Sequence, residues 1–210
     1  MRTEEFDQRL DDAWKRARSS GAITQTATQL HDHAVGYIPA AWRVKPPALL
    51  IDLGSGAGVP GIHLARELPS SRVVLLDSSK QRCEMAEAAV AAVGLGARVS
   101  VIHDRLDEMA RESAWRESAD AIVARLFGSP SDLAECGLAL LRPGGRLVVS
   151  VSGETGSWWS EAPLERLGAV HETSWSSGSG SYVSVRKLES TPHRQPRRTP
   201  ARRRDPWPSG

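Results

Sequence analysis

The chain has 210 residues, a length that suits one domain with a sizeable core. Hydrophobic residues make up 40% and charged residues 25% of the sequence, a balance typical of globular proteins that excludes a disordered or fibrous one. The apolar runs are far shorter than the ~20 residues of a membrane-spanning helix. The acidic start, Met1–Phe6, lacks the basic patch of a secretory signal. We therefore expect a cytoplasmic protein that does not enter a membrane.

The net charge of +2 is unevenly distributed. The last twenty residues carry six arginines against one acid, Asp205, so the rest of the chain is acidic. A basic arm on an acidic body favours a polyanionic partner, and a solvated, disordered tail is an equally good interpretation. Cys83 and Cys136 have no CxxC spacing and no neighbouring His cluster, so we expect neither a disulfide framework nor a metal site, and place both half-buried in helices.

The first 45 residues are predicted to be helical. Residues 3–19 form a polar stretch in which Phe6, Leu10 and Trp14 recur every four positions and share one helical face. A second helical stretch, 28–42, ends before the helix breaker Lys45-Pro46-Pro47. We interpret residues 1–45 as a helical flap on the main domain.

From Ala48 onward, short apolar strands alternate with helices, which is typical of a parallel sheet covered on both faces. The chain therefore predicts a doubly wound α/β domain. The expected strands are 49–52, 72–76, 99–102, 121–124 and 146–151. Three helices are expected: one follows the first strand and ends at residue 68, and the others span 79–93 and 131–141.

Beyond Gly153 the pattern changes to a helix over 157–166 and two strands, 169–175 and 182–188. The loop between these strands is too short for a parallel crossover, so they form an antiparallel hairpin. The domain then spans 46–189. Five prolines after Ser190 argue against a regular helix, so residues 190–210 are predicted to be an extended basic tail.

A glycine-rich motif, Asp52-Leu53-Gly54-Ser55-Gly56-Ala57-Gly58-Val59-Pro60-Gly61, directly follows the first strand and opens a helix. Glycines let the backbone turn tightly and approach a ligand where a Cβ would collide. The motif therefore indicates a binding loop, with a simple tight turn as the alternative.

Asp77 ends the second strand, about twenty residues after the glycines. A carboxylate there can accept both hydroxyls of a ribose, which NAD and S-adenosylmethionine share. Nicotinamide enzymes need GxGxxG to seat a pyrophosphate on a helix N-terminus, whereas this chain has GxGxG with Val59-Pro60 at the third glycine. This spacing favours S-adenosylmethionine.

These motifs resemble the ribosomal RNA small subunit methyltransferase G family, also called glucose-inhibited division protein B. The similarity runs from about Ala48 to Gly153 and includes Leu75-Leu76-Asp77-Ser78, Asp104-Arg105-Leu106-Asp107-Glu108 and Ala124-Arg125-Leu126-Phe127, with a Pro- and Arg-rich tail. The resemblance implies a class I S-adenosylmethionine-dependent methyltransferase fold, Rossmann-like, with a mostly parallel seven-stranded sheet and an antiparallel C-terminal hairpin. It implies methylation of N7 of a guanosine in small-subunit (16S) ribosomal RNA.

The resemblance also implies roles for individual residues. Gly54 and Val59 would line the methionine and adenosine side of the cofactor, and Asp77 would meet the ribose. Leu106 and Asp107 would flank the adenine, with Asp107 or a backbone amide at its amino edge. The predicted cofactor-binding set is Asp52, Gly54, Gly56, Gly58, Val59, Asp77, Leu106, Asp107 and Arg125.

Arg125 is the candidate catalytic residue, because the resemblance places it facing both cofactor and acceptor. A surface ion pair is the alternative for Arg125, and a solvated helix-start acid beside Arg105 is the alternative for Asp107. Guanine N7 is already a nucleophile, so the enzyme would mainly align the reactants, without a strong base.

The expected partner is ribosomal RNA or the small ribosomal subunit, bound by a monomer. The RNA backbone would be held by the flap and by tail arginines, namely Arg197, Arg198, Arg202, Arg203 and Arg204. Trp42 or Trp158-Trp159 could stack on a base, although core packing is the better interpretation.

The chain departs from the family pattern at three places. Ser152-Gly153 replaces a common Lys-Gly, His33-Ala34-Val35-Gly36-Tyr37-Ile38 keeps only the His of His-x-x-Asp-Ser-Leu, and Ala22-Ile23-Thr24 replaces Asn-Leu-Thr. Two other functions therefore stay open. One is a methyltransferase of the same fold that acts on a small molecule, and the other is a non-catalytic RNA-binding relative.

Overall fold

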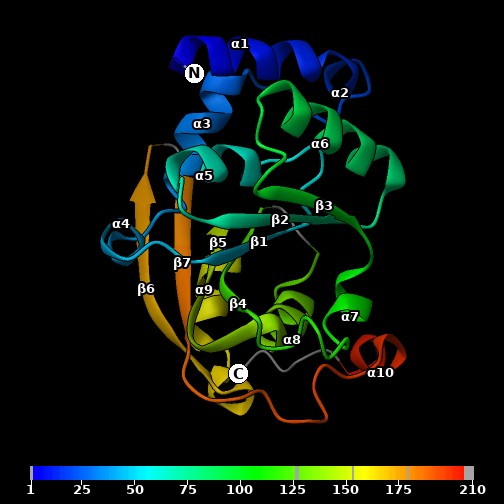
Figure 1. Ribbon diagram of the computed structural model, residues 1–210. Coiled ribbons are helices and arrows are strands. Elements are labelled where there is room, and N and C mark those ends of the chain that lie inside the picture. Colours follow the sequence, from blue (N-terminus) through cyan, green and yellow to red (C-terminus); the bar gives the residue numbers. More distant parts are fainter. Residues whose placement is uncertain (1, 126–127, 153, 179, 206–210) are drawn as a thin grey trace.

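The computed structural model describes residues 2–125, 128–152, 154–178 and 180–205 and is built around one seven-stranded sheet (Figure 1). The strand order is β3-β2-β1-β4-β5-β7-β6. The first five strands pair in parallel, and β7 pairs antiparallel with both β5 and β6. The predicted parallel sheet with an antiparallel C-terminal hairpin is confirmed. The strands are β1 Leu49–Leu53, β2 Arg72–Asp77, β3 Val99–His103, β4 Ala119–Ala124, β5 Leu141–Val151, β6 Ala169–Ser177 and β7 Gly180–Lys187.

Helices cover both faces of the sheet (Figure 1). One face carries α1 Thr3–Ala13, α2 Lys15–Ser19, α3 Ala27–Val35, α5 Gly61–Glu67 and α6 Lys80–Ala92. The opposite face carries α7 Leu106–Met109, α8 Pro130–Leu140, α9 Glu154–Glu161 and the 3-10 helix η1 Leu164–Leu167. Of the remaining helices, α4 Ala40–Val44 lies near β6 and β7, and α10 Thr199–Arg204 lies beside α7 (Figure 1).

The core consists of two apolar layers, one on each face of the sheet. Successive strand residues point to opposite faces, so Leu50 belongs to one layer and Ile51 to the other, and Val73 and Val74 divide in the same way. This burial on both sides explains why the parallel strands read as continuous apolar runs.

The N-terminal helices share a core with the sheet. Phe6, Leu10 and Trp14 are almost fully buried in the same layer as Leu50, as their spacing predicted. Each of the two expected helices is broken in two, the first at Trp14 and the second before Pro39, which has no N–H to donate within a helix. A separate flap over 1–45 stays a prediction.

The tail contains a helix, so the expectation of an extended segment was wrong. Helix α10 has Pro200 in its first turn, where a proline is tolerated because the backbone N–H there has no helical partner. Ala201, Arg202 and Arg204 then follow as good helix formers.

Within the described residues, no helix is long and apolar enough to cross a membrane. Cys83 in α6 and Cys136 in α8 carry free thiols and are buried rather than half-buried.

Candidate active site

Two adjoining cavities lie at the carboxyl ends of the central strands. The smaller has a volume of about 490 Å³ and is bordered by the glycine-rich loop after β1 and by the ends of β2 and β4. The larger, about 950 Å³, lies between α3, the ends of β4 and β5, and the start of β7. The two cavities share Arg125 and Gly128. Crevices at this edge of a doubly wound sheet are where such folds bind ligands.

The glycine-rich loop turns back on itself through residues in the left-handed region. Gly54, Gly56 and Gly58 have φ values of 70°, 58° and 100°, which L side chains rarely adopt. The backbone N–H groups of Gly54 and Ser55 both donate to the Leu76 carbonyl, which fixes the loop against β2. Gly54 and Gly56 line the smaller cavity, and their contact with a cofactor stays a prediction.

The remaining loop residues lie beneath the cavity rather than on its wall. Val59 is 3% exposed and packs in the apolar layer with the N-terminal helices. A Cβ on Gly61 would lie 2.2 Å from a Leu75 methyl group, so only glycine fits there. Contact of Gly58 and Val59 with a cofactor stays a prediction.

Asp52 is fully buried behind the loop. Its Oδ2 accepts a hydrogen bond of 2.7 Å from the Gly61 N–H, and its Oδ1 has no partner among the described residues. Burial raises the pKa of this carboxyl to about 7, although the Gly61 hydrogen bond partly offsets the rise. Asp52 therefore links the strand end to the start of α5.

Asp77 lies at the tip of β2, where its carboxylate borders the smaller cavity. Its Oδ2 accepts a 2.9 Å hydrogen bond from the Gly56 N–H, and its Oδ1 accepts from the Ser79 N–H and the Arg82 guanidinium. Each carboxylate oxygen has two lone pairs, so Oδ2 has room for one further donor such as a ribose hydroxyl. A second hydroxyl would compete with Arg82.

Leu106 and Asp107 begin α7 and form the far wall of the smaller cavity. Asp107 is 5% exposed, accepts from Arg105 at 3.0 Å and also accepts from the Thr199 hydroxyl. Burial would raise the pKa of the Asp107 carboxyl, but these hydrogen bonds and nearby arginines outweigh burial and lower it. Asp107 is thus a buried, ionised carboxylate and not the solvated acid considered above.

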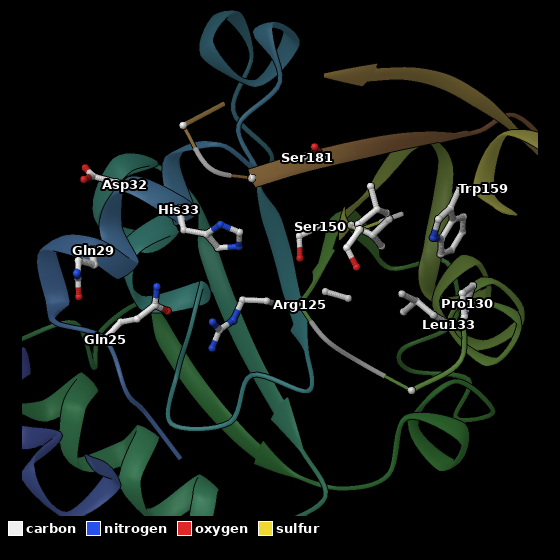
Figure 2. A pocket seen from close by; sticks show the side chains of 17 residues that line it. Gln25, Gln29, Asp32, His33, Arg125, Pro130, Leu133, Ser150, Trp159 and Ser181 are labelled. Atoms are coloured by element: carbon white, nitrogen blue, oxygen red, sulfur yellow. The ribbon is translucent and has the colours of Figure 1, made fainter. Parts of the chain in front are cut away.

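Arg125 follows β4 and extends into the larger cavity, toward Gln25 and Gln29 on one side and across from Ser150 on the other (Figure 2). It is half-buried, and no carboxylate in the described part of the chain pairs with it. Its charge adds to burial in lowering the pKa of His33. The surface ion pair considered for Arg125 is therefore absent among these residues.

An aromatic cluster packs against His33, a residue that borders the larger cavity. The Tyr182 hydroxyl donates to the His33 carbonyl at 2.7 Å, and the Tyr37 hydroxyl donates to the Ala124 carbonyl at 3.1 Å. The rings of Tyr37 and Tyr182 meet edge to face with centroids 4.9 Å apart, and Trp175 stacks on Tyr182. This cluster ties α3 to the C-terminal hairpin.

The tryptophans considered for base stacking are mostly committed to the core. Trp42 is 3% exposed within the N-terminal layer, and Trp159 is 2% exposed although it borders the larger cavity. Trp158 is partly buried against the opposite layer. Core packing is confirmed for Trp42 and Trp159.

The tail arginines fall into two groups. Arg197 pairs with the fully buried Glu135 at 2.9 Å, and Arg202 pairs with Asp132 at 2.7 Å. Arg198 and Arg204 are exposed, and the side chain of Arg203 lies outside the described residues. RNA contact by the tail stays a prediction, and for Arg197 and Arg202 it would compete with these ion pairs.

Several cavity residues could not be expected from motifs. Gln25, Gln29 and Asp32 reach the larger cavity from α3 and the turn before it, and Ser181 reaches it from β7. These residues come from distant parts of the sequence, and no spacing rule connects them. The structure also brings Arg202 to the wall of the smaller cavity.

Comparisons with solved structures agree with the fold. A methyltransferase from Geobacter sulfurreducens has a TM-score of 0.62 at 23% identity, covering 87% of this chain and 89% of that one. An O-methyltransferase from Bacillus cereus, solved in complex with SAH, has a TM-score of 0.59 at 19% identity, covering 86% and 91%. These similarities show that the chain has the class I methyltransferase fold.

The sequence comparisons are more specific. The family model of rRNA small subunit methyltransferase G matches residues 23–156. The ribosomal RNA small subunit methyltransferase G of Symbiobacterium thermophilum is 32% identical over 199 residues, covering 88% of this chain and 81% of that protein. The chain belongs to the rRNA small subunit methyltransferase G family.

Proposed function

We propose that this chain transfers a methyl group from S-adenosylmethionine to N7 of a guanosine in small-subunit ribosomal RNA. The observation that carries this proposal is the position of Arg125 on the shared wall of the two cavities. A cofactor in the smaller cavity and an acceptor base in the larger one would meet at this side chain. Membership of the family supports ribosomal RNA as the acceptor.

The smaller cavity fits the proposed cofactor. Its volume of about 490 Å³ lies within the range of small-molecule sites. A Cβ on Gly56 would meet only the Arg82 side chain, at 3.9 Å, so the loop leaves open space above it. Asp77 would take a ribose hydroxyl, and Leu106 and Asp107 would flank the adenine. When bound, S-adenosylmethionine supplies an electrophilic methyl group.

The residues of the larger cavity would then hold and align the acceptor. Guanine N7 carries an exposed lone pair, so no proton has to be removed before it reacts. Correct alignment of two reactants can lower a barrier by ~7–11 kcal/mol. The planar fork of Arg125 would donate to the guanine O6 or to an adjacent phosphate and so fix the direction of N7.

A second candidate is methyl transfer to a hydroxyl of a small molecule. The observation that favours it is His33, which borders the larger cavity and whose pKa is lowered by burial and by the charge of Arg125, so that the neutral imidazole is favoured. A hydroxyl acceptor must lose a proton, and a neutral imidazole can accept one. The third possibility, a non-catalytic RNA-binding relative, gives no account of the intact glycine loop and Asp77.

Mass spectrometry of nucleosides from 16S ribosomal RNA tests the proposal. A strain lacking the gene should lose one 7-methylguanosine, and the purified protein should restore it on that strain's RNA or small subunits. The Gly54→Val variant should fail to restore it, because φ at residue 54 is 70° and disfavours a β-branched side chain. Unchanged 7-methylguanosine in the deletion strain would reject this acceptor.

Action on ribosomal RNA would place the protein in the cytoplasm, with the small ribosomal subunit as its partner. We expect the protein to act as a monomer, which size-exclusion chromatography with light scattering would check.

A further inference from the structure

The C-terminal segment, residues 190–205, is fastened to the body at several points between Ser190 and Arg202. The Arg116 guanidinium donates to the carbonyls of Thr191 and Gln195, both at 2.6 Å. The Glu117 carboxylate accepts from the Thr191 N–H at 2.8 Å. The buried Lys187 amine donates to the Leu167 carbonyl at 2.8 Å and to the Thr191 hydroxyl. The start of the segment is therefore held by a dense set of hydrogen bonds.

Ion pairs then fix the rest of the C-terminal segment. Glu135 on α8 has no exposed side-chain area, and its partner is Arg197. A buried carboxylate that lost its cation would be strongly destabilising, so the paired state is the stable one. Beyond this pair, the segment turns into α10, which lies beside α7 (Figure 1).

Helix α10 brings two side chains to Asp107 on the wall of the smaller cavity. The Thr199 hydroxyl donates to Asp107 Oδ2, and an Arg202 nitrogen lies 3.7 Å from the same oxygen. Arg202 is 6% exposed and pairs with Asp132 at 2.7 Å. Arg202, Asp107 and Asp132 all border the cavity.

We propose that the C-terminal segment is the outer wall of the cofactor site, and that Arg202 and Thr199 are positioning residues that orient Asp107 toward the adenine. The proposed cofactor places its ribose at Asp77, so the adenine extends to α7, the helix that α10 covers. Arg202 acts through its contacts with Asp107 and Asp132 and does not contact the methyl group that the cofactor transfers. Docking of the segment and binding of the cofactor are thus coupled.

The test is calorimetric binding of S-adenosylhomocysteine to the full chain, with no RNA present. Arg202→Ala should raise Kd by about tenfold, within the range of measured couplings between sites. Arg194→Ala is the matched control, because Arg194 is exposed on the same segment and carries the same charge. It should bind like the wild type.

A second ligand separates orientation of Asp107 from a general loosening of the fold. S-inosylhomocysteine has a carbonyl where adenine has its amino group, so the wild type should bind it more weakly than S-adenosylhomocysteine. In Arg202→Ala the ratio of the two Kd values should fall toward one. Thr199→Val removes only the hydroxyl on Asp107 and should lower the ratio in the same direction, which keeps the test open if Arg202→Ala does not fold.

A wild-type Kd in Arg202→Ala, an equal loss in Arg194→Ala, or an unchanged ratio in the folded variants would overturn the proposal. The inference rests on the proposed cofactor, and wild-type protein that bound neither ligand would reject that cofactor along with it. Wild-type binding together with an unaffected Arg202→Ala would reject only the role of the C-terminal segment.

Discussion

Gly36 lies so close to the Tyr182 side chain that position 36 has no room for a side chain of its own. A Cβ added to Gly36 would lie 2.3 Å from the Tyr182 hydroxyl oxygen and 2.4 Å from the ring carbon that bears it. The family motif has an Asp where this chain has Gly36. The departure at the C-terminal end of α3 is therefore matched by an aromatic residue on β7, about 150 positions later in the chain.

Gly36→Ala should destabilise the protein, because the new methyl group forces α3 and β7 apart. Overpacking of this kind costs about 1–3 kcal/mol, which lowers Tm by roughly 2–4 °C per kcal/mol at this size. Gly96→Ala is the control, because nothing lies within 4 Å of a Cβ there. A double-mutant cycle with Tyr182→Leu, measured by denaturant unfolding, should show strong coupling. Additive free energies would contradict the close contact.

Arg125→Lys should slow methyl transfer while leaving stability unchanged. Lysine keeps the charge but loses the planar fork, so a loss of ~1–3 kcal/mol in orienting hydrogen bonds would slow the reaction by roughly 5- to 150-fold. Single-turnover methylation of ribosomal RNA measures the rate, and a melting curve measures stability. Arg146→Lys, in a surface pair with Glu172 away from both cavities, is the control. Wild-type turnover in Arg125→Lys would show that the fork is not used.

The exposed tail arginines should contribute to RNA binding. Replacing both Arg198 and Arg204 by Ala removes two charges that the body does not pair, so binding should weaken and depend less on salt. The slope of log K against log salt should fall by about 0.7–0.9 for each phosphate that is no longer neutralised. Filter binding over a salt series measures it, with cofactor affinity as the internal control. Equal slopes for variant and wild type would remove these residues from the RNA interface.

His63 should make the fold less stable in acid. The ring lies buried among Phe6, Trp14 and His31, and neither ring nitrogen has a partner among the described residues. Burial lowers the pKa of His63 from 6.5 to about 3. Between these values the unfolded chain binds a proton that the folded chain does not, so the free energy of unfolding falls as pH drops below 6.5.

His63→Leu should remove this loss of stability in acid. Its gain over the wild type in free energy of unfolding should be about 2 kcal/mol larger at pH 5 than at pH 7.5. Asp52 has a raised pKa and therefore acts in the opposite direction, but it is present in both proteins and cancels in the difference. Urea unfolding at the two pH values gives the comparison. A gain that does not depend on pH would mean that His63 is protonated within the fold.

Sequence patterns were most reliable where one local cause dominates. The strands of the parallel sheet are apolar because both faces are covered, and the glycine loop follows β1 because only glycine adopts its φ values easily. The position of Arg125 between two cavities follows from the same topology, since it comes directly after β4.

Predictions from the sequence failed where the deciding contact is distant. The prolines of the C-terminal segment suggested an extended, solvated arm, but its conformation is set by Glu135, Asp132 and Asp107, which precede it by 60 or more positions. No local sequence pattern indicates that Glu135 is buried and paired with a cation. The Tyr37 and Tyr182 cluster was missed for the same reason, because a close packing of rings leaves no spacing signal.

Segments near both ends of the chain contact the site, one at the glycine-rich loop and the other at the wall of the smaller cavity. The Trp14 indole donates a 2.9 Å hydrogen bond to the Ala57 carbonyl in the glycine-rich loop, and Arg202 borders the same cavity from the opposite side. During synthesis, a nascent chain that has produced all seven strands still lacks one wall of this site. The enzyme therefore cannot assemble its complete pocket until residue 202 has emerged from the very kind of particle on which it is proposed to act.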